Sequence, residues 1–216
     1  MRLLTPRSRP GLSYRDAVAL IKSLSSKELG KNEMVMLGVR GYYRDSLGKK
    51  GANDRGLYDD AIFIVTGTGI KLINSSYIAS FNANVDPSIF RRSIANLKPG
   101  EYKYQTGFHN ITKPGRMYPA FRQASLVTVV RDQVGEVSGW FGINIHKGGI
   151  LGTSSEGCQT IAPKQWDEFI TTAYTALGIP PGASQLKSGA KAQKEFRYIL
   201  LADSDLDNVL GKGWRS

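Results

Sequence analysis

Two side chains that can perform thiolate chemistry lie close together in the sequence. Cys158 is the only cysteine of the chain, and His146, one of two histidines, precedes it by a short glycine-containing loop. An imidazole beside a thiol can take its proton, and the resulting ion pair can lower the cysteine pKa from ~8.5 into the range ~3.5–7.5. The pair therefore predicts a cysteine nucleophile with a histidine general base, in the chain order histidine first and cysteine second.

The residues before Cys158 favour catalysis over a structural role, although a lone cysteine is most often a small buried hydrophobe. Gly157 lets the backbone approach a substrate closely, and Ser154 and Ser155 are poor neighbours for a core cysteine. We expect the backbone N–H groups of Gly157 and Cys158 to be the donors that stabilise an oxyanion.

Other polar residues are candidates for lining the same site. The run 139–146 alternates as a strand does, so Asn144 shares a face with His146 and is a candidate for substrate binding; a solvated strand position is the alternative. The second histidine, His109, is a further substrate-binding candidate, against the alternative of an ordinary loop histidine. The sequence has no metal-ligand spacing such as His-Glu-x-x-His, and one cysteine excludes a multi-cysteine zinc site. We therefore expect no metal and no cofactor.

This pattern resembles the motif of the L,D-transpeptidase catalytic domain. In that family a histidine at a strand end, usually followed by glycine, precedes a loop that closes with Ser/Thr-His-Gly-Cys. Within residues 139–162 the matching segments are His146-Lys147-Gly148-Gly149 and Ser155-Glu156-Gly157-Cys158. The separation of eleven residues is shorter than is usual in the family, and Glu156 stands where the family has histidine. Two further segments, 38–43 and 53–56, resemble phage-encoded proteins of this type.

The resemblance implies both a fold and a reaction. The fold is a β-sandwich or barrel with a few flanking helices. The reaction is attack by Cys158 on the carbonyl at the L-centre of the diamino acid in the peptidoglycan stem peptide, followed by transfer of the thioester to an amine or to water. His146 would be the base, held by a backbone carbonyl, and Ser155 would shape the site.

Glu156 and Ser154 complete the candidate substrate-binding residues. An inward-pointing Glu156 carboxylate would raise the cysteine pKa by like-charge repulsion. We therefore expect Glu156 to point outward or to contact a cationic group of the substrate.

Length and composition predict one β-rich α+β domain over residues 1–216. Gly 24 is about 11% of the chain, against a typical ~7%, which indicates many turns. Apolar periodicity and turn residues predict a helix over 13–27, a short helix over 86–97 and a strong helix over 166–177. Strands are expected at 34–40, 61–66 with a return at 70–73, 101–108, 126–131, 139–146 and 196–201.

The formal net charge of +11 predicts attraction to anionic wall polymers or an anionic cell envelope, aided by a basic N-terminal segment over 1–12. A generic basic surface is the alternative, and we expect no specific nucleic-acid partner. The N-terminus lacks the apolar core of a signal peptide, and no stretch is long enough to span a membrane, so we expect a cytoplasmic monomer until release to the wall.

The sequence thus favours an endolysin-like peptidoglycan hydrolase, an L,D-carboxypeptidase or endopeptidase, with bacterial peptidoglycan as its partner. A cross-linking L,D-transpeptidase is the alternative enzyme. A non-enzymatic protein that binds the envelope or nucleic acid through its basic surface is the alternative from another class.

Overall fold

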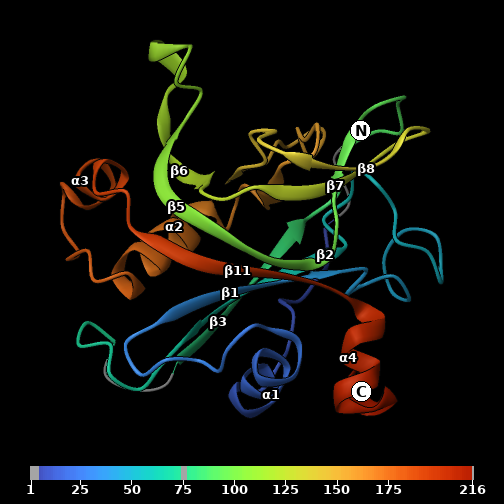
Figure 1. Cartoon of the computed structure of the whole chain (residues 1–216), viewed down its shortest axis with the longest axis horizontal. Helices are drawn as coiled ribbons and strands as arrows, with labels where there is room; N and C mark the ends of the chain where they lie inside the picture. Colours follow the sequence, from blue (N-terminus) through green and yellow to red (C-terminus); the bar gives the residue numbers. More distant parts are fainter. Residues whose placement is uncertain (1–4, 74–76, 216) are drawn as a thin grey trace.

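Eight strands close into a barrel at the centre of the molecule (Figure 1). The structure is a computed structural model that describes residues 5–73 and 77–215. Around the barrel the order is β1 (Met34–Arg40), β11 (Glu195–Ala202), β5 (Gly100–His109), β6 (Tyr118–Gln123), β9 (Ile145–Lys147), β10 (Gln159–Ile161), β3 (Tyr77–Asn84) and β2 (Asp60–Thr66). The β1–β11 and β9–β10 pairs are parallel and the other neighbours are antiparallel.

Two apolar clusters follow from the alternation of side chains along these strands. Residues of all eight strands form one cluster that fills the barrel, and Tyr104 and Tyr198 meet there edge to face at 5.2 Å. The alternate residues of β1, β2 and β11 form a second cluster outside the barrel. These three strands are buried on both faces, which explains their nearly continuous apolar sequences.

Helices cover the barrel from different sides. The outer cluster packs against α1 (Tyr14–Leu24) and α4 (Asp203–Leu210). The inner cluster includes α2 (Trp166–Ala176), whose Phe169 meets Phe81 and Phe121 edge to face at 5.1 and 5.8 Å. The short elements are α3 (Gln185–Lys191), η1 (Pro114–Arg116) and η2 (Lys212–Arg215). Within the described residues, no helix combines the length and the apolar character that crossing a membrane requires.

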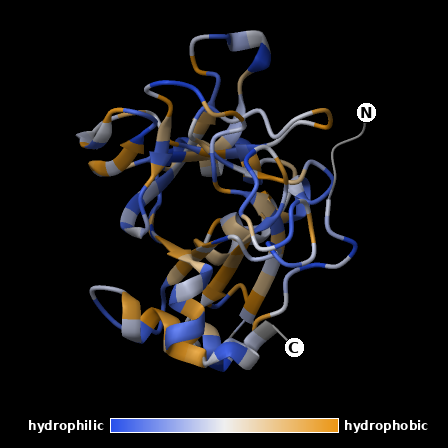
Figure 2. Cartoon of the chain, turned by 90° about the vertical axis from the view of Figure 1, so that its right-hand side faces the viewer, coloured by the Kyte–Doolittle hydropathy of each residue, from blue (hydrophilic) through white to orange (hydrophobic). Residues whose placement is uncertain are grey.

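A small second sheet lies beside the barrel and borders the site. It has the order β4 (Ala95–Leu97), β7 (Val127–Arg131) and β8 (Gly135–Gly139), with antiparallel pairs. Figure 2 shows hydrophobic segments concentrated in the barrel strands and the helices, with hydrophilic segments more frequent in the loops.

The expected β-rich α+β single-domain fold is confirmed, with four α-helices and eleven strands in residues 5–73 and 77–215. The helix at 13–27, the helix at 166–177 and the strands at 34–40, 61–66, 101–108 and 196–201 are all present within a few residues of their expected bounds. Residues 1–4 of the expected basic segment lie outside the described residues.

Three expectations about local structure are wrong. Residues 70–73 form a turn, and the strand that follows β2 and pairs with it is β3, which begins only at Tyr77. The stretch 86–97 is not helical, because the Asp86 carboxylate pairs with Arg40 rather than capping a helix, and 95–97 form β4. The run 139–146 is not one strand, because the backbone leaves β8 at Gly139 and Gly142 adopts φ 68° before β9 begins.

Candidate active site

His146 lies on β9, and Cys158 directly precedes β10, the parallel neighbour of β9. Thr160 is opposite His146 in the register of β10 and β9, so Cys158 precedes the partner of His146 by two residues. Because side chains alternate along a strand, the face that carries His146 also carries Thr160 and Cys158. The other face is the barrel interior, where Gln159 accepts a hydrogen bond from Tyr198.

The His146 ring is held by groups on three sides. Its Nδ1 lies 2.9 Å from the carbonyl oxygen of Lys147 and 3.4 Å from the hydroxyl of Tyr118. Since a carbonyl can only accept, Nδ1 carries the proton and Nε2 has the free lone pair. The ring of His109 stacks on that of His146, with centroids 4.1 Å apart and an interplanar angle of 18°. The backbone carbonyl expected to orient the base is therefore that of Lys147.

This packing keeps His146 neutral. Burial and, after it, the charge of nearby His109 lower the pKa of His146 to about 4, against a smaller opposing effect of the Lys147 carbonyl. The pKa of His109 is also lowered, first by burial and then by Arg122. At neutral pH the His146 imidazole is therefore unprotonated and competent to accept a proton.

The thiol of Cys158 contacts backbone groups of the segment that precedes β9. Its Sγ accepts from the Asn144 N–H at 3.4 Å and donates to the Gly142 carbonyl at 3.5 Å. In the described chain no hydrogen bond joins Sγ to His146. Burial raises the thiol pKa, with the Asn144 N–H opposing the rise and the Glu156 charge adding to it.

The resting pair is consequently a neutral thiol beside a neutral imidazole. This is the reverse of the lowered thiol pKa that the sequence led us to expect, and the cause is desolvation of both groups. Chemistry at this site requires proton transfer from Sγ to the imidazole together with nucleophilic attack, rather than a standing ion pair.

Ser155 holds the backbone around the nucleophile. The buried Ser155 Oγ donates to the Cys158 carbonyl at 2.6 Å and accepts from the Gly157 N–H at 3.0 Å. One of the two expected oxyanion donors, the Gly157 N–H, is therefore already engaged. The Cys158 N–H has no partner within the described residues and remains the donor available to a substrate oxygen.

Gly157 fits where another residue would not. Its φ is +129°, and a Cβ at this position would lie 2.4 Å from the Ala95 carbonyl oxygen, so any side chain would force the two segments apart. The close backbone approach that Gly157 permits here is to β4, whereas the sequence led us to expect an approach to a substrate.

Ser88 ties the loop between His146 and Cys158 to the rest of the molecule. Its N–H donates to the Ser155 carbonyl at 2.8 Å, and its Oγ accepts from the Ser155 N–H at 2.7 Å. The same Oγ lies 2.6 Å from Oγ1 of Thr153. Ser154 is exposed in this loop, with φ 59°.

The structure places the remaining candidates at the edge of the site. Glu156 points outward, with its side chain 76% exposed and 3.4 Å from Arg91, as expected for a residue that must not face the thiol. Asn144 lies directly before β9, is almost fully buried, and its Oδ1 has no hydrogen-bond partner within the described residues. His109 contacts the base itself, through the stacked rings.

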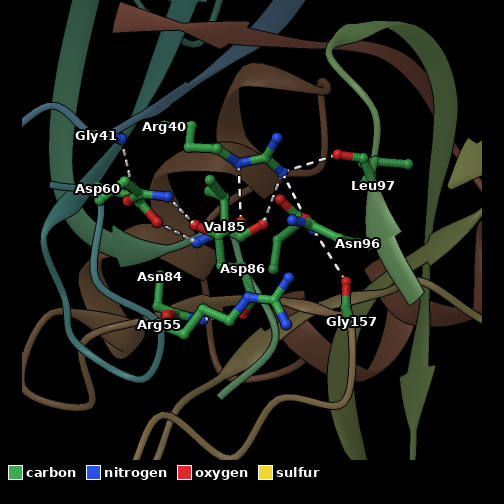
Figure 3. A network of polar contacts seen from close by, with 12 residues as sticks. Arg40, Gly41, Arg55, Asp60, Asn84, Val85, Asp86, Asn96, Leu97 and Gly157 are labelled. Carbon is green, nitrogen blue, oxygen red and sulfur yellow. Dashed lines mark hydrogen bonds and ion pairs between the residues drawn. The ribbon is translucent and has the colours of Figure 1, made fainter. Parts of the chain in front are cut away.

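A buried polar network lies beside the segment that packs against Gly157 (Figure 3). Arg40 Nε lies 2.9 Å from the Asp86 carboxylate, and Asp60 accepts from the N–H groups of Gly41 and Val85 at 2.6 and 2.7 Å. Burial and the charge of Asp86 raise the Asp60 pKa well above its usual range. Arg40 Nη2 also donates to Asn96 Oδ1 and to the Leu97 carbonyl, both at 2.8 Å. The network therefore fixes the segment against which Gly157 packs.

The chain matches no protein-family model, no curated protein and no solved structure. In residues 5–73 and 77–215 no group of three or more histidine, cysteine and acidic side chains could hold a metal ion.

Three residues that matter to the geometry were not anticipated from the sequence. Tyr118 contacts the base, Ser88 clamps the loop, and Gln123 holds the segment that meets the thiol. Each acts through a contact between segments distant in the chain, and the local sequence around each carries no signal of it.

Proposed function

We propose that the chain is a cysteine-dependent peptidoglycan hydrolase of the L,D-transpeptidase type, which cleaves stem peptides through a Cys158 thioester. The observation that carries the proposal is the placement of His146 on β9 and of Cys158 directly before the parallel strand β10, with His146 Nδ1 bound to a carbonyl and Nε2 free. The motif resemblance supplies the substrate class, and the net charge of +11 suits an anionic wall.

The reaction balances with the residues present. His146 Nε2 accepts the proton of Cys158 Sγ as sulfur attacks the substrate carbonyl, and the Cys158 N–H stabilises the oxyanion. The tetrahedral intermediate collapses with cleavage of the C–N bond, and the imidazolium returns its proton to the leaving amine. Water, deprotonated by His146, then attacks the thioester and releases a carboxylic acid and the free thiol.

Removing the sulfur tests this mechanism directly. In the Cys158→Ala variant we expect complete loss of product when purified peptidoglycan is incubated with the protein and its fragments are identified by mass spectrometry. Cys158 is only partly exposed, but alanine differs from it by one sulfur atom, so we expect the variant to fold normally, which circular dichroism checks. Product formation at the wild-type rate by the folded variant would rule the thioester out.

The same mass spectra separate hydrolysis from transfer. A thioester partitions between water and an amine according to which of them the site holds near the carbonyl, since a positioned acceptor acts at a high effective concentration. With excess glycine or a second stem peptide, a hydrolase yields mainly the trimmed peptide. Dominant exchange products or new cross-links would instead assign the chain as a transpeptidase, with Cys158 and His146 in unchanged roles.

A further inference from the structure

The oxyanion formed at Cys158 has fewer backbone donors than the sequence led us to expect. The Gly157 N–H is bonded to Ser155 Oγ at 3.0 Å, which leaves the Cys158 N–H free for a substrate oxygen. In acyl-transfer sites the loss of one such donor lowers turnover by about 10²–10³-fold, so the number of donors matters. A second donor must then come from a side chain beside the thiol.

Asn144 contacts the thiol through its own backbone. Its N–H donates to Cys158 Sγ at 3.4 Å, and its carbonyl accepts from the Gln159 N–H at 2.8 Å. Neighbouring Ile143 and Ile145 are both buried in the cluster that fills the barrel, which holds the backbone between them in place. Covalent geometry keeps the Asn144 amide group within about 5 Å of the N–H that meets Sγ. The amide therefore lies close to where a carbonyl attacked by sulfur must be.

The side-chain amide of Asn144 has no structural partner. The residue is 9% exposed, and neither end of its amide forms a hydrogen bond with residues 5–73 or 77–215. Of the two ends only Oδ1 is fully enclosed among these residues, so Nδ2 is the end that a substrate atom can reach. An enclosed amide oxygen without a donor lowers the stability of a fold, because it has lost its hydrogen bonds to water. A residue that weakens the fold and contacts the nucleophile indicates a role in the reaction.

We propose that Asn144 Nδ2 is the second donor to the oxyanion, beside the Cys158 N–H. The inference rests on the proposed function in that it requires acyl transfer to Cys158. As Sγ bonds to the carbonyl carbon, its proton passes to His146 Nε2 and the C=O electron pair moves onto oxygen, where the Asn144 amide donates to the negative charge. The electron pair returns when the leaving group departs, and Asn144 is unchanged by the cycle.

A small ester tests the donor without a peptidoglycan substrate. p-Nitrophenyl acetate acylates a thiol with release of nitrophenolate, and this reaction passes through an oxyanion on the attacked carbon. Iodoacetamide alkylates the same thiol by displacement of iodide, without an oxyanion. Asn144→Ala keeps the backbone N–H that meets Sγ, so we expect acylation of Cys158 to be at least tenfold slower than in the wild type and alkylation to proceed at the same rate.

A second variant separates this role from a structural one. Asn144→Leu keeps the volume of the side chain and removes both polar ends. It should slow acylation as much as Asn144→Ala does and raise the midpoint of urea denaturation, because an enclosed oxygen without a partner is gone. A residue needed only for folding would give the opposite shift of the midpoint.

Asn82→Ala is the control, because Asn82 is a buried asparagine whose amide is fully bonded. Its Nδ2 donates to the Ser8 carbonyl and to Tyr43 Oη, both at 3.2 Å, and its Oδ1 accepts from Gln165 Nε2 at 2.7 Å. Its replacement should lower the urea midpoint and leave the ratio of acylation to alkylation at Cys158 unaltered.

Three results would overturn the assignment of Asn144. They are equal slowing of acylation and alkylation in the Asn144 variants, slowing of neither, and a wild-type ratio of acylation to alkylation no higher than that of N-acetylcysteine. Failure of the proposed function is a different result. In that case the ester would acylate Cys158 with the expected dependence on Asn144, but the wild type would release no fragment from peptidoglycan.

Discussion

At the scale of single residues, the site depends on side chains that hold the backbone as much as on those that react. Ser155 illustrates this, because its hydroxyl satisfies two backbone groups on either side of the nucleophile. Gly157 contributes only its lack of a side chain, since the Ala95 carbonyl occupies the space that a Cβ would need. The position of Sγ therefore results from the loop rather than from a direct bond to His146.

We predict different effects for substitutions at the two adjacent serines. Ser155→Ala leaves the Gly157 N–H and the Cys158 carbonyl without their partner, which should lower the free energy of unfolding by roughly 1–3 kcal/mol and reduce turnover at least tenfold. Ser154→Ala removes an exposed hydroxyl whose described bond, to the Gly152 carbonyl, is 3.5 Å long. It should therefore change the free energy of unfolding and the turnover only slightly. Urea denaturation and peptide cleavage measure the two quantities, and equal effects of the two substitutions would contradict this role for Ser155.

The stacked histidines predict the pH dependence of the reaction. His146 must be neutral to accept a proton, and its pKa is lowered to about 4, so kcat/KM should stay level as pH falls through 6.5 and decline only near pH 4. His109→Asn removes a repelling charge and opens the site to water, and both changes should move this decline to higher pH. An ordinary decline near pH 6.5 in the wild type, unaffected by His109→Asn, would show that the stack does not tune the base.

At the scale of elements, Gln123 at the end of β6 shapes the irregular segment between β8 and β9. Its Oε1 accepts from the N–H groups of Phe141 and Ile143, each at 3.2 Å, and its Nε2 donates to the Gly139 carbonyl at 3.0 Å. These side-chain bonds take the place of strand-to-strand hydrogen bonds at the segment where the backbone turns toward the thiol. Local periodicity cannot reveal such a side chain, because the residues it holds lie sixteen or more positions away.

Replacing this amide should loosen the segment that contacts the nucleophile. In Gln123→Leu two backbone N–H groups lose their acceptor, and we expect a loss of stability of roughly 2–4 kcal/mol and faster hydrogen exchange at Phe141 and Ile143. Gln105→Leu on the neighbouring β5 makes the same chemical change at a side chain without a described partner and should leave exchange at these amides unaltered. Protection that persists in Gln123→Leu would mean that other contacts hold the segment.

The helices and strands that the sequence predicted correctly are those whose conformation is determined by the apolar pattern of their own residues. The apolar stripe of α2 and the apolar runs of β1 and β2 are complete within eleven residues or fewer. β9 and β10 have three residues each and exist only because they pair with each other and with β3 and β6. Cys158 and His146 could be selected by residue type, whereas the contacts of Tyr118 and Ser88 arise only from this long-range pairing.

At the scale of the whole molecule, the basic charge is not confined to the candidate site. A groove of about 870 Å³ at the far end of the barrel is lined by five basic side chains, Lys27, Lys71, Lys103, Lys194 and Arg197, and by two carboxylates, Glu33 and Glu195. Glu33 pairs with Lys27 and Arg197, which leaves Lys71, Lys103 and Lys194 as the basic side chains outside that cluster. The groove borders Met34, and in the register of the sheet Met34 lies level with Tyr77, the first residue of β3. β10, which directly follows Cys158, pairs instead with the last residue of β3, Asn84. The groove is therefore separated from Cys158 by the length of a strand.

This arrangement predicts that attachment to the wall and cleavage can be separated. The net charge of +11 should bind isolated walls by electrostatic attraction, and binding should weaken as salt rises, since the screening length falls from ~10 Å at 0.1 M to ~3 Å at 1 M. Lys103→Gln with Lys194→Gln should weaken sedimentation with walls more than Lys187→Gln with Lys191→Gln, although both pairs remove two charges. Cleavage of a small soluble stem peptide should be the same in both, because neither pair lies near Cys158. Wall binding that does not change with salt concentration would reject electrostatic targeting. If both double variants lose wall binding to the same extent, the attraction comes from the total charge and not from the groove.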